Sequence, residues 1–221
     1  MKKPDPRYRL IVFDWDGTLM DSASGIVACI QEASREMGLE VPSRERASHV
    51  IGLGLQDSLR YAVPGLPESG YLRFAELYRK HFQARSADMI LFEGVPELLA
   101  RLRDAGHVLA VATGKSRRGL DRALDDSKLR GFFAASRCAD ETDPKPHPAM
   151  LRELMAELAH EPRELLMIGD TSHDLDMAAS AGVDAVAVTY GAHAEDTLRA
   201  RSPKAIVSSV PELQAWLTAN G

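Results

Sequence analysis

The 221-residue chain has a formal net charge of −5 at pH 7, and 45% of its residues are hydrophobic while 27% are charged. This balance is typical of globular proteins and excludes disordered and collagen-like classes, and the absence of any run of five like charges argues against a surface for nucleic acid or anionic membranes. The two cysteines, Cys29 and Cys138, lie outside any CxxC spacing, which argues against a disulfide framework or a zinc site and favours a cytoplasmic protein.

The first predicted strand is short, and a long helical stretch follows it. Residues 9–13 form an apolar run typical of a buried strand. From about residue 22 to residue 87 no further buried strand is recognisable, and apolar residues recur at helical spacing over 26–37 and 71–82. We therefore expect residues 21–87 to form an inserted, small, all-helical cap domain.

After this insertion, predicted strands and helices alternate along the chain. Such alternation is typical of a parallel sheet that is covered by helices on both faces. The expected fold class is therefore α/β, with a doubly wound, Rossmann-like parallel sheet built from residues 1–20 and 88–221. The predicted strands span 108–113, 165–169, 185–189 and, at the edge, 205–208, and the predicted helices span 95–104, 147–158, 174–181 and 210–217.

Acidic residues follow two of the predicted strands at the point where each strand ends. Asp14 and Asp16 follow the first strand, and Asp170 and Asp174 follow the strand at 165–169. Because ligands bind at the carboxyl ends of strands in an open α/β sheet, these carboxylates are expected to converge. Two like charges about 4 Å apart repel by about 4 kcal/mol at an effective dielectric of 20, so the cluster requires a cation. Oxygen ligands suit a hard ion, and Mg²⁺ is the expected cofactor.

The string Asp-Trp-Asp-Gly-Thr at residues 14–18 resembles the DxDGT signature of the haloacid dehalogenase superfamily. The other motifs of this family follow in order: Thr113 at a strand end, Lys145 within Lys-Pro-His-Pro, and the acidic motif Gly-Asp-x-x-x-Asp at 169–174. The helical insertion falls where members with a small helical cap carry theirs. The chain looks closest to the phosphoglycolate phosphatase-like group, and the resemblance covers essentially its whole length.

The resemblance implies roles for the acidic residues. Asp14 is expected to be the nucleophile that becomes an aspartyl phosphate, and Asp16 the general acid and base. The metal is expected to be held by Asp14, by the backbone carbonyl of Asp16 and by Asp170. Asp174 is expected to support the metal, either directly or through water.

The resemblance also implies roles for the neutral and basic motif residues. Thr113 and the backbone of Gly114 are expected to bind the phosphoryl oxygens. Lys145 is expected to neutralise negative charge on the phosphoryl group and on the nucleophile. Both act electrostatically, which suits phosphoryl transfer because its transition state spreads charge over the equatorial oxygens.

Asp16 bears on the type of reaction. Relatives that dehalogenate haloacids lack an acid two places after the nucleophile, whereas phosphatases and phosphosugar mutases keep it. We therefore expect Mg²⁺-dependent hydrolysis of a small phosphomonoester of the phosphoglycolate or sugar phosphate type. A phosphosugar mutase, which needs a second phosphate site in the cap, and a non-catalytic module that binds a phosphorylated ligand are the alternatives.

A glycine-containing turn in the predicted cap is the candidate for substrate specificity. Gly52, Leu53 and Gly54 resemble the cap loop that reads the leaving group in such relatives, and an ordinary turn between helices is the alternative. Two basic residues of the predicted cap, Arg60 and Lys80, are candidates for contact with the substrate. The favoured interpretation is that both lie on solvated helix faces.

The remaining expectations concern partners and motion. The expected partner is a small phosphorylated metabolite, without nucleic acid or membrane, since no segment approaches the roughly 18 apolar residues of a membrane span. Monomer and homodimer both stay open. His147 and His173 receive no ligand role, and His173 is expected to cap or pack near the following helix. The connections near 19–21 and 87–92 are expected hinges of the cap.

Overall fold

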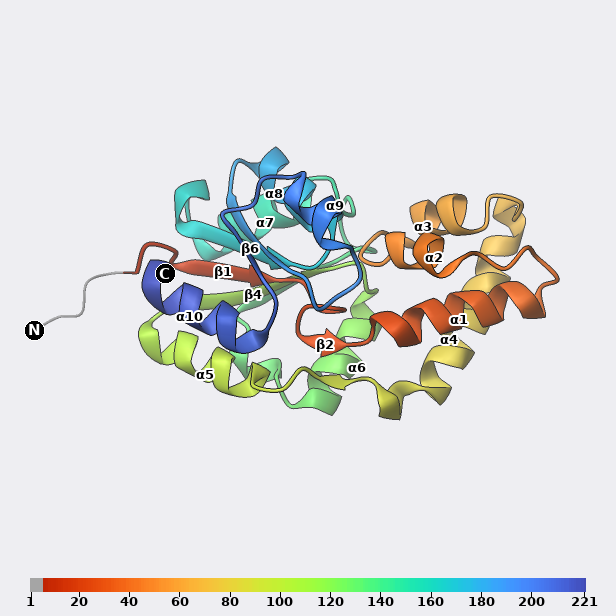
Figure 1. The fold of residues 1–221 in the computed structure, drawn as a ribbon, viewed down its shortest axis with the longest axis horizontal. Helices are drawn as coiled ribbons and strands as arrows, with labels where there is room; N and C mark the ends of the chain where they lie inside the picture. The colour runs from red at the N-terminus through yellow and green to blue at the C-terminus, as the bar shows by residue number, and fades with distance from the viewer. Residues whose placement is uncertain (1–5) are drawn as a thin grey trace, which may run out of the picture.

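The computed structural model describes residues 6–221 as a parallel sheet between helices, with a helical lobe at one end (Figure 1). The strands of the sheet are β1 (Leu10–Phe13), β4 (Val108–Thr113), β5 (Ala135–Cys138), β6 (Leu165–Gly169), β7 (Asp184–Val188) and β8 (Ala205–Val207). Their order is β5-β4-β1-β6-β7-β8, and every neighbouring pair is parallel. The predicted α/β fold class is confirmed.

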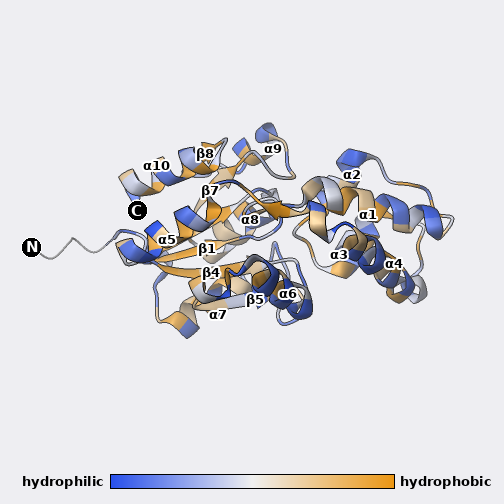
Figure 2. Ribbon diagram, turned by 90° about the horizontal axis from the view of Figure 1, so that it is seen from below, coloured by the Kyte–Doolittle hydropathy of each residue, from blue (hydrophilic) through white to orange (hydrophobic). Residues whose placement is uncertain are grey.

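Helices cover both faces of this sheet because side chains alternate along each strand. On one face lie α5 (Val95–Ala105), α6 (Arg117–Ser127) and α10 (Val210–Asn220), and on the other α7 (Ala149–Leu158), α8 (Ser172–Ala181) and α9 (Glu195–Arg199). In β1, Ile11 and Phe13 face the first group, whereas Leu10 and Val12 face the second. Figure 2 shows the central strands as a hydrophobic layer between helices with hydrophilic outer faces.

The chain between β1 and β4 forms the helical lobe. Its helices are α1 (Ala23–Glu36), α2 (Arg44–His49), α3 (Leu55–Ala62) and α4 (Tyr71–Ala84). They pack around their own apolar cluster, in which Ile30, Leu59 and Phe74 are buried. In Figure 1 the lobe lies at the end of the molecule toward which β1 runs. The lobe therefore faces the carboxyl ends of the central strands.

A two-stranded ribbon joins the lobe to the rest of the molecule. Its strands are β2 (Met20–Asp21) and β3 (Ile90–Leu91), which pair in antiparallel fashion. Next to the ribbon, the backbone N–H of Phe92 donates to the carbonyl of Leu19 at 3.1 Å. The two connections, which were predicted separately, therefore run side by side.

Several elements differ from the prediction. Strand β5 and helices α6 and α9 lie where no element was predicted. Helix α7 begins at Ala149 rather than residue 147, because a proline at 148 forms its N-cap, and α8 begins at Ser172 rather than residue 174, because Thr171 caps it. Within residues 6–221, no helix is both long and apolar enough to cross a bilayer. Short 3₁₀ turns lie at Glu68–Gly70, Ser86–Asp88, Arg130–Phe132 and Pro162–Glu164.

Candidate active site

Three of the predicted acidic residues meet at the carboxyl edge of the sheet. Asp14 directly follows β1, Asp170 follows the neighbouring strand β6, and Asp174 lies in the first turn of α8. Carboxylate oxygens of the three residues lie within 4.8 Å of one another. At most 1% of each residue is exposed to solvent. The structure thus gathers buried negative charge at one point.

Lys145 lies inside this cluster and is fully buried. Its Nζ is 2.8 Å from Oδ1 of Asp14 and 2.6 Å from Oδ1 of Asp174. Burial opposes its charge, but the two carboxylates raise the pKa of Lys145 above its usual value, so it stays charged. Burial raises the pKa of Asp14 to about 7, against the opposing charge of Lys145, and burial raises the pKa of Asp170 well above its usual value. One lysine therefore does not neutralise the cluster.

The two carboxylate oxygens of Asp14 have different surroundings. Oδ1 accepts a hydrogen bond from the backbone N–H of Trp15 at 2.7 Å and also contacts Lys145. Oδ2 is buried and has no hydrogen-bond partner among the described residues. A Cβ atom added to Gly52, which has φ +90°, would lie 3.9 Å from this oxygen. Asp14 is therefore held through one oxygen while the other is free beneath a loop of the lobe.

Asp170 is held by groups from two loops. Its Oδ1 accepts from the hydroxyl of Thr18 at 2.9 Å, and its Oδ2 accepts from the backbone N–H of Ala192 at 2.7 Å. A Cβ atom on Gly17, where φ is +81°, would lie 2.1 Å from Oδ2 of Asp170. Only glycine suits this place, which explains the glycine of the first motif in physical terms.

Asp174 takes part in the cap of α8. Its Oδ2 accepts from the backbone N–H of Thr171 at 3.1 Å and from the hydroxyl of Thr171 at 2.7 Å. This capping box leaves Oδ1 directed at Lys145. Helix capping therefore fixes the orientation of the carboxylate.

Asp16 stands apart from the three clustered carboxylates, because its side chain is held by other groups. Its Oδ1 accepts from the hydroxyl of Ser22 at 2.7 Å, and its Oδ2 lies 2.9 Å from Nζ of Lys115. The Lys115 ammonium also lies 4.7 Å from the ring centroid of Phe82 in α4. Lys115 was not predicted, although its position directly after Thr113 and Gly114 is a signal that would have found it.

The loop at residues 52–54 reaches the same edge of the sheet. Thr113 ends β4 and is buried, and its hydroxyl oxygen accepts from the backbone N–H of Lys115 at 3.3 Å. A Cβ atom on the next residue, Gly114, would lie 2.6 Å from the carbonyl of Gly52 and 2.9 Å from that of Leu53. One on Gly54 would lie 3.1 Å from the side chain of Pro144. The loop therefore packs against the segments that carry Thr113 and Lys145.

The two basic residues weighed as substrate contacts lie elsewhere. Arg60 forms ion pairs with Asp57 and Glu68 on the exterior of the lobe. Lys80 pairs with Glu36, also near solvent. The structure brings neither of them to the carboxylate cluster, in line with the solvated helix faces favoured from the sequence.

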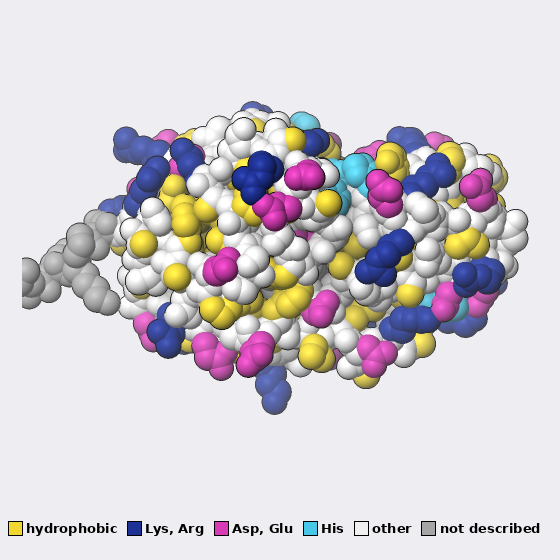
Figure 3. Space-filling model, in the orientation of Figure 1, with side chains coloured by type: hydrophobic (Ala, Val, Ile, Leu, Met, Phe, Trp, Pro, Cys, Tyr) yellow, Lys and Arg dark blue, Asp and Glu magenta, His cyan; other side chains and the backbone are white. Residues whose placement is uncertain are grey.

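Histidines form a separate cluster beside the site, where the lobe meets the sheet. The rings of His49, His173 and His193 have centroids 5.1 to 5.4 Å apart. Figure 3 shows histidine side chains reaching the surface at this junction. Burial lowers the pKa of His173. Burial and the neighbouring His173 lower the pKa of His193 to about 4. His173 contacts the lobe rather than only its own helix, whereas His147 is exposed beside Asp143.

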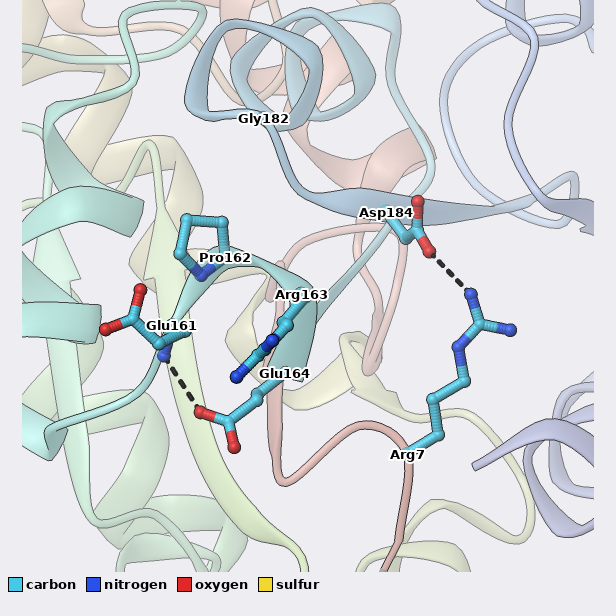
Figure 4. A pocket seen from close by; sticks show the side chains of 7 residues that line it. All are labelled: Arg7, Glu161, Pro162, Arg163, Glu164, Gly182 and Asp184. Atoms are coloured by element: carbon cyan, nitrogen blue, oxygen red, sulfur yellow. Dashed lines mark hydrogen bonds and ion pairs between the residues drawn. The ribbon is translucent and has the colours of Figure 1, made fainter.

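A hollow of about 950 Å³ lies at the amino ends of the strands, on the opposite side of the sheet domain from the carboxylate cluster (Figure 4). It is lined by charged residues near the amino ends of β6 and β7, among them Glu164 and Asp184, and an ion pair joins Arg7 to Asp184 at 3.2 Å. None of the motif residues lines it. The hollow therefore does not belong to the candidate site.

Named relatives of this chain include phosphatases and one kinase. It is 35% identical over 210 residues to the probable phosphatase IndB of Dickeya dadantii, with 92% of this chain and 91% of the relative covered. It is 37% identical to the tyrosine-protein kinase PtkA of Mycobacterium tuberculosis over 190 residues, which are 85% of this chain but only 64% of that protein. Phosphoglycolate phosphatase of Pseudomonas putida is 30% identical, with 93% and 78% covered.

Solved structures and a family model agree with these similarities. The crystal structure of a predicted phosphatase from Clostridium acetobutylicum matches with a TM-score of 0.85 and 27% identity, and covers 96% of this chain and 99% of that one. The model described as haloacid dehalogenase-like hydrolase matches residues 11–188. This match spans both sheet and lobe, and the chain therefore belongs to the haloacid dehalogenase-like hydrolase family.

Proposed function

We propose that the chain, a phosphatase of this family, hydrolyses a small phosphomonoester with Mg²⁺ through an aspartyl phosphate on Asp14. The observation that carries the proposal is the free, buried Oδ2 of Asp14. It belongs to a cluster of three carboxylates that contains one buried lysine, so it is a positioned nucleophile in a site that needs a further cation before a phosphoryl group can approach.

The donor atoms of the cluster fit a magnesium ion. Asp14, Asp170 and Asp174 offer only carboxylate oxygen atoms, which are the ligands that a hard cation prefers. In this proposal Asp14, the backbone carbonyl of Asp16 and Asp170 hold the ion, and Asp174 supports it. When bound, Mg²⁺ supplies positive charge that offsets the repulsion between the carboxylates and an incoming phosphoryl group.

The reaction follows from the positions of Asp14 and Asp16. In the first step an oxygen of Asp14 forms a bond to phosphorus, the bond from phosphorus to the leaving oxygen breaks, and Asp16 gives its proton to that oxygen. In the second step Asp16 takes a proton from water, whose oxygen bonds to phosphorus and releases Asp14. Ser22 and Lys115 orient the Asp16 carboxylate for both transfers.

The remaining motif residues act by charge and position. Lys145 neutralises the nucleophile and the phosphoryl oxygens. The hydroxyl of Thr113 and the backbone N–H of Gly114 donate hydrogen bonds to the same oxygens. Because phosphoryl transfer depends mostly on positioned charge, these groups account for much of the expected rate enhancement.

The proposal includes a division of the chain into a sheet domain, residues 1–20 and 88–221, and a cap domain, residues 21–87; of these, residues 1–5 lie outside the part that the structure describes. The separate apolar cluster of the lobe and the paired connections support this division. The loop at residues 52–54 then covers the nucleophile and contacts the leaving group. A carboxylate or sugar leaving group beside Lys115 fits the phosphoglycolate or sugar phosphate type.

Hydrolysis is favoured over a mutase reaction by the arrangement of basic residues. A mutase needs cap groups that bind a second phosphate, but Arg60 and Lys80 are engaged with carboxylates away from the site. A non-catalytic binding module has no need of a nucleophile and a general acid together.

The free thiols of Cys29 and Cys138 support the cytoplasmic location that belongs to the same proposal.

The test is phosphate release from a panel of phosphorylated metabolites, including phosphoglycolate, sugar phosphates, nucleotides, pyrophosphate and phosphotyrosine. Each compound is assayed with Mg²⁺ and with a chelator, using the intact protein and the Asp14→Asn variant. Release that needs both the metal and Asp14 is the expected result, and the highest kcat/KM identifies the substrate. Release that persists in Asp14→Asn would rule out the aspartyl phosphate.

A further inference from the structure

Two histidines near the candidate active site, His173 and His193, form hydrogen bonds to the backbone of the helical lobe. Nε2 of His173 donates to the carbonyl oxygen of His49 at 2.7 Å, and Nε2 of His193 donates to the same oxygen at 3.2 Å. His49 is the last residue of α2, and the final carbonyls of a helix lack partners within the helix. Side chains from the sheet side therefore satisfy an acceptor that belongs to the lobe.

His193 uses both of its ring nitrogens in this arrangement. Nδ1 accepts from the backbone N–H of Ser172 at 3.0 Å, in the first turn of α8, so Nε2 must carry the proton that goes to His49. The backbone N–H of His193 also donates to the carbonyl of Asp170 at 3.3 Å. The side chain and backbone of His193 thus connect the segment of Asp170 and Ser172 to the end of α2.

A short, packed segment transmits this contact to the nucleophile. Val50 and Ile51 follow His49, are each only 3% exposed, and belong to the apolar cluster of the lobe. The backbone N–H of Leu53 donates to the carbonyl of Val50 at 3.2 Å, which closes the turn. Gly52, in the middle of this turn, lies over the free oxygen of Asp14. A shift of the His49 carbonyl must therefore move the loop above the nucleophile.

We propose that His173 and His193 are positioning residues that hold the 52–54 loop over Asp14 and thereby determine which leaving groups the site accepts. This inference rests on the proposed function. The histidines touch neither Asp14 nor the phosphoryl position; they act on substrates through the loop. Their loss weakens discrimination among leaving groups rather than the chemistry common to all phosphoryl donors.

His173 gives the sharper test, because His193 also binds the loop of Asp170. We compare the best ester of the panel with acetyl phosphate, whose leaving group ends in a methyl group and offers the loop no polar group at its far end. In His173→Ala, kcat/KM for the ester is expected to fall about tenfold, mostly through KM, which corresponds to loss of one hydrogen bond. For acetyl phosphate it is expected to change less than about threefold. His173→Gln keeps an N–H donor and is expected to restore most of the loss.

The matched control is His147→Ala, since this histidine follows Lys145 by two positions but its side chain is exposed to solvent beside Asp143. This variant is expected to leave kcat/KM unchanged for both the ester and acetyl phosphate. An equal loss of kcat/KM for the ester and for acetyl phosphate in His173→Ala would show that the histidine acts on the chemistry common to both compounds. That result would overturn the inference, and so would no loss for either compound.

A second measurement does not depend on turnover. Hydrogen exchange of the backbone amides at residues 50–54 is expected to be about tenfold faster in His173→Ala than in the intact protein and in His147→Ala. Unchanged exchange would overturn the inference. Faster exchange in a protein that hydrolyses no member of the panel would support the contact and refute the proposed function alone.

Discussion

Replacing Lys145 by methionine removes the cation from the buried carboxylate cluster. Its Nζ lies 2.8 Å from Asp14 and 2.6 Å from Asp174, and each contact corresponds to about 6 kcal/mol of Coulomb attraction at an effective dielectric of 20. Desolvation of the lysine offsets much of this, and loss of one partner from a buried pair costs roughly 3–5 kcal/mol. At about 2–4 °C per kcal/mol for a chain of this size, the metal-free variant should melt roughly 10 °C lower.

The assay is thermal unfolding at pH 8 in chelator, followed by circular dichroism, with turnover measured in parallel. The deficit should shrink at pH 6, because a raised pKa lets Asp14 take up a proton when no lysine opposes it. The double variant Lys145→Met with Asp174→Asn removes one of the two orphaned charges and should recover about half of the stability but none of the activity. A melting temperature within about 2 °C of the intact protein, with turnover within about tenfold, would refute the reasoning.

Three further predictions follow from individual contacts. Asp14→Asn should raise the melting temperature of the metal-free protein at pH 8 but not at pH 4: burial raises the pKa of Asp14 from 3.8 to about 7, so the intact protein loses stability as the pH rises from about 4 to about 7. Melting curves with equal pH dependence in the two proteins would contradict this. Lys115→Met should lower kcat roughly ten- to a hundredfold, because Asp16 loses a group that orients it, and Lys115→Arg should retain most activity in steady-state assays. Burial raises the pKa of Cys29 to about 11 and that of Cys138 to about 12, so a thiol reagent at pH 8 should label neither in the folded protein and both in denaturant.

The sequence predicted the central strands well, because buried parallel strands are continuous apolar runs. Strand β5 lacked this signal: its four residues are Ala, Ser, Arg and Cys, and the first three are only half-buried at the edge of the sheet. The arginine within it, Arg137, binds Glu153 and Glu157 rather than the hydrophobic interior. Edge strands of this kind are recognisable only from their pairing with a neighbour.

The site shows a similar division between local and distant signals. Motif residues at strand ends could be predicted because parallel strands bring their carboxyl ends to one edge. The contact of Lys115 with Asp16 joins residues 99 positions apart and depends on the path of two loops. The contact of His173 with His49 joins the sheet side to the lobe across 124 positions. The position of Lys115 after a strand end marks it as a candidate site residue, but neither contact leaves a periodic pattern in the sequence, so the partner of neither side chain could be predicted from it.

The pairing of β2 with β3 gives the helical lobe a common entrance and exit. Because the strands lie side by side, a tight turn could join Asp21 to Ile90 without moving either end. The lobe is then an exchangeable module, and a lobe of different length or shape could be grafted onto the ribbon while the sheet and its carboxylates stay in register. New substrate preferences can thus arise by replacing one contiguous segment, with the reaction chemistry inherited unchanged.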